Sequence, residues 1–145
     1  MIPRTLLDLN VLIALTDTEH VHYRKAQEWF DSSDGKELGV CALTESGLVR
    51  VTTNPSARNP PHSFEKAAAV LADLARRPGY RFWPITDSWA ALTAPFADRI
   101  FGHQQVTDAY LLGLAIKEDG VLVTFDRGLK YMAGPEFSRN LLVLD

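Results

Sequence analysis

Short apolar segments alternate along this chain with longer segments in which apolar residues recur at helical spacing. Strands are predicted where apolar or branched residues run together, at residues 5–7, 38–43, 80–85, 121–125 and 141–144. Helices are predicted over residues 10–15, 22–32, 63–77, 88–100 and 104–119, and over a further segment that begins near residue 45. This alternation predicts an α/β fold, a three-layer α/β/α sandwich with a mostly parallel central sheet of four to five strands.

Single residues mark where several of these elements begin, break or end. Thr44 offers a side-chain oxygen that would cap a helix starting near Glu45. Pro84 indicates that the third strand lies at an edge of the sheet or ends there, and Pro95 predicts a break in the helix that contains it. Gly120 ends the last long helix, so the fourth strand begins directly after it.

The composition is that of one ordinary globular domain. Of the 145 residues, 46% are hydrophobic and 23% are charged. Because the sequence shows no repeat and no linker, we expect a single domain over residues 1–145. The one cysteine, Cys41, stands in an apolar segment and is expected to be a small core residue. No apolar run approaches the roughly 18 residues of a membrane span, and the N-terminus lacks the pattern of a signal peptide. We therefore expect a cytoplasmic protein.

Four acidic residues stand where strands end or on the apolar faces of helices. Asp8 follows the first strand and Asp126 closes the fourth, while Glu45 and Asp108 share helical stripes with apolar residues three and four positions further on. The carboxyl ends of parallel strands meet at one edge of a sheet, so these side chains are expected to lie near one another. Buried carboxylates at one edge require a cation to offset their charge.

Each acid taken singly has a simpler explanation. Asp8 and Asn10 could be helix caps, Asp126 could be a turn residue, and Glu45 could be a solvated acid in a first helical turn. Asp108 is the hardest to explain in this way, because its neighbours at helical spacing are core residues.

A set of oxygen ligands without a histidine or cysteine cluster selects Mg²⁺ or Mn²⁺. Such an ion suits phosphoryl chemistry, in which it activates a water for attack on a phosphodiester and neutralises the leaving oxygen. We take Asp8, Glu45, Asp108 and Asp126 as the catalytic and metal-binding candidates. Asn10 and Thr124 are expected beside them as orienting groups, since Thr124 and Asp126 share one side of the strand.

Four segments, in order and spacing, resemble the motifs of PIN-domain nucleases, and the match covers nearly the whole chain. They are residues 8–12 (DLNVL), 44–45 (TE), 107–115 (TDAYLLGLA) and 124–126 (TFD). The segments Thr53-Asn54-Pro55 and His20-Val21-His22 are further similar to the VapC toxins of bacterial toxin-antitoxin pairs. The resemblance implies an endoribonuclease that depends on Mg²⁺ or Mn²⁺, with metal-binding acids at Asp8, Glu45, Asp108 and Asp126. It also implies a VapB-type antitoxin partner that occupies the active-site groove, and a toxin homodimer.

The chain departs from the family pattern at one position. Many members carry a further acid two residues after the last motif aspartate, where this chain has Gly128. The number of metal ions, one or two, is therefore open.

Contacts to RNA need a local basic patch, because 15 Lys and Arg against 18 Asp and Glu give a net charge of −3. We take Arg50 and Arg127 as substrate-binding candidates and expect Arg127 alone to lie near the metal. His20 and His22 are expected to serve a loop or a helix entry, in contact with RNA, rather than a transition metal. Trp29 and Trp83 are expected in the core. The wider set of candidates for the patch consists of Arg24, Arg50, Arg58, Arg99 and Arg127.

Two other functions compete with the nuclease. A haloacid-dehalogenase-like phosphotransferase would use Asp8 as a nucleophile, but it needs an acid two residues later, where this chain has Asn10. A PIN-like module that binds RNA or protein without cutting is the other alternative, and the presence of all four acids argues against it.

Overall fold

The computed structural model describes residues 4–32 and 37–145, and in this part of the chain five strands form one parallel sheet. The order across the sheet is β3-β2-β1-β4-β5. The strands are β1 (Thr5–Leu7), β2 (Leu38–Cys41), β3 (Tyr80–Trp83), β4 (Val121–Thr124) and β5 (Leu141–Val143). The predicted α/β class and parallel sheet are confirmed, and β3 occupies the edge position that Pro84 indicated.

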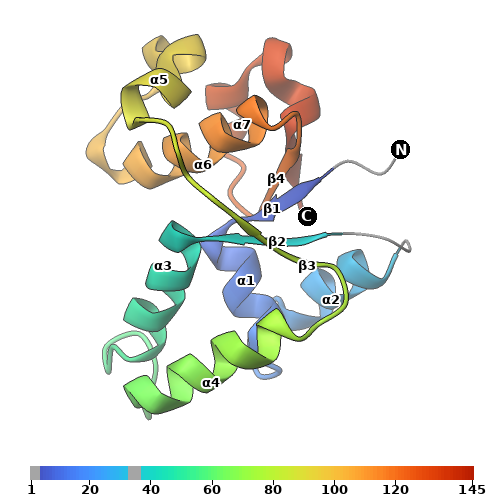
Figure 1. Ribbon diagram of the computed structural model, residues 1–145, viewed down its shortest axis with the longest axis vertical. Helices are drawn as coiled ribbons and strands as arrows, with labels where there is room; N and C mark the ends of the chain where they lie inside the picture. The colour runs from blue at the N-terminus through green and yellow to red at the C-terminus, as the bar shows by residue number, and fades with distance from the viewer. Residues whose placement is uncertain (1–3, 33–36) are drawn as a thin grey trace.

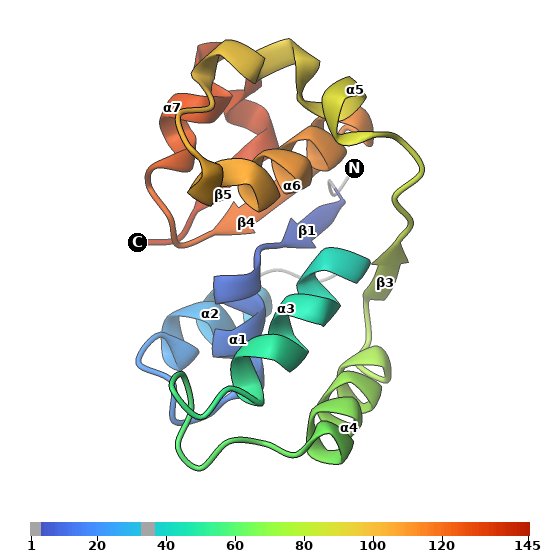
Figure 2. The same ribbon diagram turned by 90° about the vertical axis from the view of Figure 1, so that its left-hand side faces the viewer.

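Helices cover both faces of this sheet, which confirms the three-layer architecture (Figures 1 and 2). One face carries α1 (Leu9–Thr16), α2 (Tyr23–Asp31), α3 (Ala42–Thr52) and α4 (Phe64–Ala75). The other face carries α5 (Trp89–Thr93), α6 (Val106–Lys117) and α7 (Leu129–Ala133). Among the described residues, no helix is long and apolar enough to cross a membrane.

Alternation along the strands sends neighbouring side chains into two separate cores. Leu6 and Leu122 pack with the α5, α6 and α7 layer, whereas Leu7 and Val123 pack with the α1 to α4 layer. Both faces of the sheet are therefore buried, as is usual for parallel sheets. Trp83 is 1% exposed and belongs to the first core, and Cys41 is buried there as well, so both are confirmed as core residues.

The start of α3 corrects one prediction from the sequence. The strand was expected to reach residue 43 and Thr44 to cap a helix near Glu45, but β2 ends at Cys41 and α3 begins at Ala42. Thr44 lies inside the first turn, where its hydroxyl accepts from the Cys41 amide (3.1 Å) and also lies 3.1 Å from the Cys41 carbonyl. An apolar run does not by itself distinguish a strand from the buried start of a helix, which is why the boundary was misplaced.

The second half of the chain contains short helical segments that the periodicity did not resolve. The helix predicted over residues 88–100 breaks at Pro95 as expected, into α5 and a 3-10 segment, Ala94–Arg99. The helix predicted over 104–119 likewise divides into a 3-10 turn at His103–Gln105 and α6. α7 and the 3-10 segment Pro135–Asn140 were not predicted, because elements this short show little periodicity.

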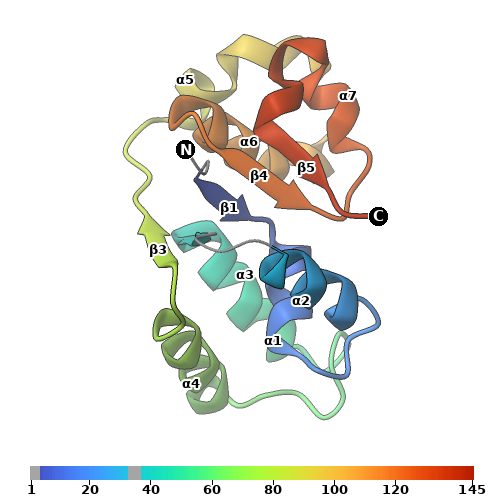
Figure 3. The same ribbon diagram turned by 90° about the vertical axis from the view of Figure 1, so that its right-hand side faces the viewer.

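The strand order places a switch point between β1 and β4. The chain moves from β1 outward to β2 and β3, then returns to place β4 on the other side of β1 (Figure 3). Loops and helix starts diverge at such a point, so the carboxyl ends of β1 and β4 form the default ligand-binding edge of the sheet.

Candidate active site

Asp8 directly follows β1 and caps α1. Its Oδ1 accepts the Leu9 amide at 2.7 Å, while its own amide donates to the Val123 carbonyl of β4 at 2.9 Å. The residue is only 6% exposed, and burial raises the pKa of its carboxyl, although the hydrogen bonds from Thr124 and Leu9 act in the opposite direction. Asp8 is thus both a helix cap and a buried acid held in one orientation.

The Thr124 hydroxyl connects the acidic site to β4. It donates to Asp8 Oδ2 at 2.7 Å and accepts hydrogen bonds from Asn10 Nδ2 at 3.3 Å and from the Asp126 amide at 3.0 Å. Asn10 completes the network, since its Oδ1 accepts the Phe125 amide at 3.3 Å. Asn10 and Thr124 therefore lie beside the acidic residues, the position predicted for them from the sequence, and Thr124 contacts Asp8 directly.

Asp126 stands in the turn after β4, exposed to solvent. Its Oδ1 accepts the Gly128 amide at 2.8 Å, so the carboxylate supports a local turn in addition to any role in the site. Its charge also raises the pKa of Asp8. Asp126 is consequently close enough to Asp8 for their charges to interact, with one carboxylate oxygen committed to the turn.

Asp108 lies in the first turn of α6 and is half-buried. Its pKa is raised to about 6, first by burial and then by the charges of Asp8 and Asp126. The three aspartates, which come from three separate segments of the chain, thus gather at the switch point between β1 and β4.

Glu45 lies in the first turn of α3 and is partly buried. Its charge acts on Tyr80, the first residue of β3, whose pKa is raised by burial and then by Glu45. The structure does not group Glu45 with the three aspartates by any hydrogen bond or pKa effect that involves the described residues.

The carboxylates are not arranged as a closed set of ligands. Within residues 4–32 and 37–145, no three His, Cys, Asp or Glu side chains converge tightly enough to hold a metal ion. A site for Mg²⁺ does not require this, because the ion keeps several of its waters and is usually held by one or two carboxylates. The donor set of Asp8, Asp108 and Asp126, all hard oxygens, fits such an ion.

Arg99 and Arg127, two of the arginines considered for the basic patch, form polar contacts within the protein. Arg99 donates to the Met132 carbonyl at 2.9 Å and to the Ala133 carbonyl at 3.1 Å, so it fastens α7 and is not free to contact RNA. Arg127 follows Asp126 and forms an ion pair with Asp145 at 3.2 Å. Both partners of that pair are exposed, and such a pair is weak enough to open for a ligand.

The other basic candidates lie on the α1 to α4 layer. Arg24 and Arg50 are exposed on α2 and α3, and Arg50 borders an open hollow together with Phe64. Arg58 forms an ion pair with Asp17 at 3.4 Å, an interaction that no pattern in the sequence predicts.

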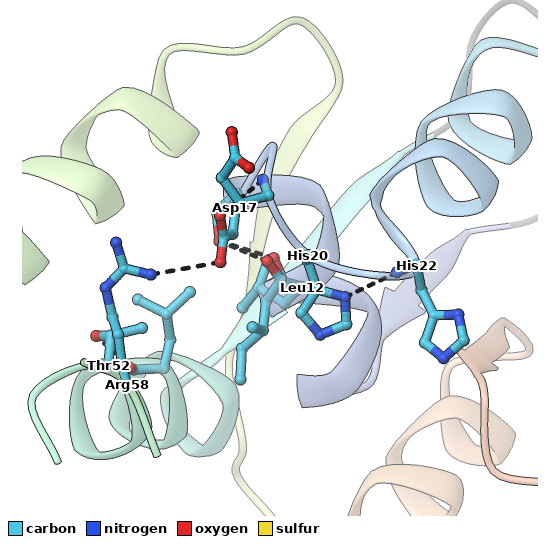
Figure 4. Close-up of polar contacts among 10 residues, drawn as sticks. Leu12, Asp17, His20, His22, Thr52 and Arg58 are labelled. Atoms are coloured by element: carbon cyan, nitrogen blue, oxygen red, sulfur yellow. Dashed lines mark hydrogen bonds and ion pairs between the residues drawn. The ribbon is translucent and has the colours of Figure 1, made fainter. Parts of the chain in front are cut away.

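His20 and His22 hold the loop between α1 and α2. His20 Nδ1 accepts the His22 amide at 3.0 Å (Figure 4), and the His22 ring stacks on Phe125 with ring centroids 4.8 Å apart. Phe125 lies between Thr124 and Asp126, so this stack borders the acidic site. The contact of Phe125 with His22 was not predicted, because the sequence pattern placed Phe125 at the end of an apolar strand.

Comparisons with known proteins show which family the chain belongs to. The family model described as "PIN domain" matches residues 5–135. Ribonuclease VapC44 of Mycobacterium tuberculosis is 39% identical over 133 residues, covering 91% of this chain and 92% of the relative. Ribonuclease VapC39 of the same species is 38% identical over 124 residues, covering 86% and 89%.

Two solved structures share the fold. One is a chain from the crystal structure of VapBC2 from Rickettsia felis bound to a DNA fragment from their promoter, with a TM-score of 0.66, 14% identity and full coverage of both chains. The other is from FitAcB of Neisseria gonorrhoeae, with a TM-score of 0.60, 19% identity and coverage of 97% and 96%. Because the family model and the VapC relatives each span most of its length, the chain belongs to the PIN-domain family and, within it, to the VapC group.

Proposed function

We propose that this protein is an Mg²⁺- or Mn²⁺-dependent endoribonuclease that acts as the toxin of a VapBC-type pair. The observation that carries the proposal is the gathering of Asp8, Asp108 and Asp126 at the switch point, where burial and then the charges of Asp8 and Asp126 raise the pKa of Asp108. Such mutual repulsion is costly unless a cation offsets it. The relatives named as VapC ribonucleases support RNA as the substrate.

The side chains of this chain would bind and orient the reacting groups. Asp8, fixed by Thr124 and Leu9, presents its carboxylate in one orientation, and Asp108 and Asp126 add charge beside it. A bound Mg²⁺ or Mn²⁺ would activate a water molecule and offset the negative charge that develops on the phosphodiester. Glu45 is proposed as the fourth acid of the site.

Arg50 and Arg127 are proposed to bind RNA phosphates outside this centre. Arg127 is adjacent to Asp126 in sequence, and its exposed ion pair with Asp145 leaves it able to exchange partners. Arg50 is exposed on α3, one turn beyond Glu45.

We also propose a VapB-type antitoxin as partner, a homodimer, and a cytoplasmic location. The printed titles of the two solved structures name a VapBC2 pair and FitAcB, which supports an antitoxin partner. The rings of Phe101 and Tyr131 lie 5.1 Å apart and are largely exposed, an apolar surface that a second subunit would cover. Light scattering of the purified protein tests the dimer.

The function is tested by incubating the wild type, Asp108→Asn and Asp73→Asn with single-stranded RNA and Mg²⁺, and then mapping the RNA ends. We expect new, defined ends from the wild type and from Asp73→Asn, whose exposed carboxylate lies on α4 away from the site. Asp108→Asn and the wild type with EDTA should give none. Identical RNA ends for wild type and Asp108→Asn would contradict the proposal.

A binding module without catalytic activity is the alternative outcome of the same experiment. It would retain RNA in the presence of EDTA and give no product with Mg²⁺. A phosphotransferase of the haloacid-dehalogenase type has less support, because the Asn10 amide is held by Thr124 and Phe125 and cannot act as the required acid.

A further inference from the structure

A hollow of about 270 Å³ lies between α1, the end of α3 and the loop that leads to α4. Small-molecule pockets usually have volumes of about 300 to 1,000 Å³, so this hollow is slightly smaller. Its size suits a single planar ring system. Ile13, Val51 and Val70 provide apolar walls, and Arg58 and His62 provide polar ones. None of these residues has a role in the acidic site described above.

Asn10 links the hollow to the acidic site, because it belongs to the surroundings of both. Asn10 lines it at one end and also bonds Thr124 Oγ1 and the Phe125 amide, which flank the aspartates. Ile13 and Asp17 follow Asn10 along the same face of α1 at helical spacing. A strand of RNA with its scissile phosphate at Asp8 would therefore pass its neighbouring nucleotide over this hollow.

Two residues that line the hollow each carry a buried polar atom without a partner. Among the described residues, Arg58 Nε and His62 Nδ1 belong to a small group of buried side-chain atoms that make no hydrogen bond. Buried donors and acceptors are nearly always paired, so two unpaired atoms on residues that line one hollow point to a ligand that pairs them when these side chains adjust to it.

The charge in the hollow disfavours a phosphate as that ligand. The lining includes one carboxylate, Asp17, and one guanidinium, Arg58, and they form an ion pair (Figure 4). The pKa of His62 is lowered, mainly by burial and then by Arg58 and Lys66, so His62 is neutral near pH 7. A neutral heterocycle with a carbonyl acceptor matches these walls better than an anion does.

We propose that this hollow receives one nucleobase of the RNA, the one next to the cleaved bond. The ring would lie against Ile13, Val51 and Val70, and a ring carbonyl, as in uracil, cytosine or guanine, would accept the Arg58 Nε hydrogen. Arg58 would then be a specificity-determining residue. The proposal rests on the proposed function for its substrate, but its test does not require catalysis.

The first measurement follows the methyl NMR signals of Ile13, Val51 and Val70 while uridine, guanosine, adenosine, cytidine or inorganic phosphate is added. Arg58→Lys keeps the charge opposite Asp17 but removes the Nε hydrogen, and Arg139→Lys is the matched control on an exposed arginine. We expect uridine, cytidine or guanosine to shift these signals more than adenosine, which has no ring carbonyl, and Arg58→Lys to weaken that binding at least about fivefold. Shifts caused by phosphate instead, or an unchanged affinity in Arg58→Lys, would overturn the proposal.

The second measurement uses RNA oligonucleotides that differ only in the base next to the cleaved bond, including one that lacks that base. Arg58→Lys should reduce discrimination between bases by about tenfold in kcat/KM, with cleavage of the abasic RNA unchanged. An equal loss on every oligonucleotide, or a loss of affinity only for a co-expressed antitoxin, would overturn it. Nucleoside binding without cleavage by the wild type would contradict the proposed function and leave the nucleobase site standing.

Discussion

The Thr124 hydroxyl donates a 2.7 Å hydrogen bond to Asp8 Oδ2 and so joins two residues that stand 116 positions apart in the chain. The same hydroxyl accepts from Asn10 and from the Asp126 amide. The Thr124 side chain therefore fixes the orientation of three groups. They are the Asp8 carboxylate, the Asn10 side-chain amide and the backbone amide of Asp126.

Replacing Thr124 with Val tests this network. The variant keeps the shape of the side chain but removes the hydrogen-bond partner of Asp8 Oδ2, Asn10 Nδ2 and the Asp126 amide, so the free energy of unfolding should fall by about 1–3 kcal/mol. Under the proposed function, activity against RNA should fall about 10- to 100-fold, because Thr124 orients Asp8, which is proposed as a metal ligand. Urea unfolding and cleavage assays measure the two effects. Thr124→Ser keeps the hydroxyl and should restore most of both, and a Val variant as stable and active as the wild type would show that the network has no such role.

The raised pKa of Asp108 predicts a pH-dependent stability of the metal-free protein. The folded-state pKa of about 6 exceeds the ordinary value of 3.8, so the folded state binds the proton more tightly than the unfolded chain does. Stability from this residue is therefore present at low pH and is lost as the pH rises through this range. Asp108→Asn stays neutral, and at about pH 7.5 with EDTA it should be more stable than wild type by about 1–2 kcal/mol, allowing for partial solvent exposure.

Chemical unfolding of both proteins at about pH 4 and about pH 7.5 checks the direction of this effect. The difference should nearly vanish at the lower pH, where Asp108 is protonated in the folded wild type. If Asp108→Asn were less stable than wild type at the higher pH, the carboxylate would be forming favourable contacts, and the repulsion inferred here would be wrong.

Gly113 marks the closest approach between α5 and α6. A Cβ at this position would lie 2.5 Å from the Leu92 carbonyl oxygen, a backbone atom that cannot move aside without displacing α5. Gly113→Ala should therefore lower the free energy of unfolding by about 1–3 kcal/mol, despite the better helix propensity of alanine. Gly102→Ala, at a position with open space around it, is the matched control and should lie within about 0.5 kcal/mol of wild type. Thermal or urea unfolding of the two variants decides, and equal stabilities would contradict the packing described here.

The sequence predicted the sheet and its flanking helices because periods of two and of about 3.6 residues are carried by the chain itself. The apolar segments at β1 and β4 and the long stripe of α6 are of this kind. It misplaced the start of α3, since the apolar residues of a buried strand and of a buried helix look alike. It did not predict α7, which is too short to show a period.

The candidate site was predictable only in part. Asp8 and Asp126 could be placed because parallel strands end at a common edge. The ion pair of Arg58 with Asp17 and the use of Arg99 to hold α7 could not, because they join segments whose relative position is set by packing. The position of Glu45 was also difficult to predict. It depends on where α3 begins, and the sequence pattern placed that start near residue 45 rather than at Ala42.

Binding of Mn²⁺ to the purified protein, followed by electron paramagnetic resonance of the free ion, tests the acidic site most directly. The wild type and Asp73→Asn should bind Mn²⁺ with equal affinity, and Mg²⁺ should compete for the same site. Asp108→Asn and Asp8→Asn should each weaken the affinity about 10-fold or more. An affinity that is unchanged in both variants would contradict the proposed assignment of these aspartates as metal ligands, and with it the proposed mechanism of RNA cleavage.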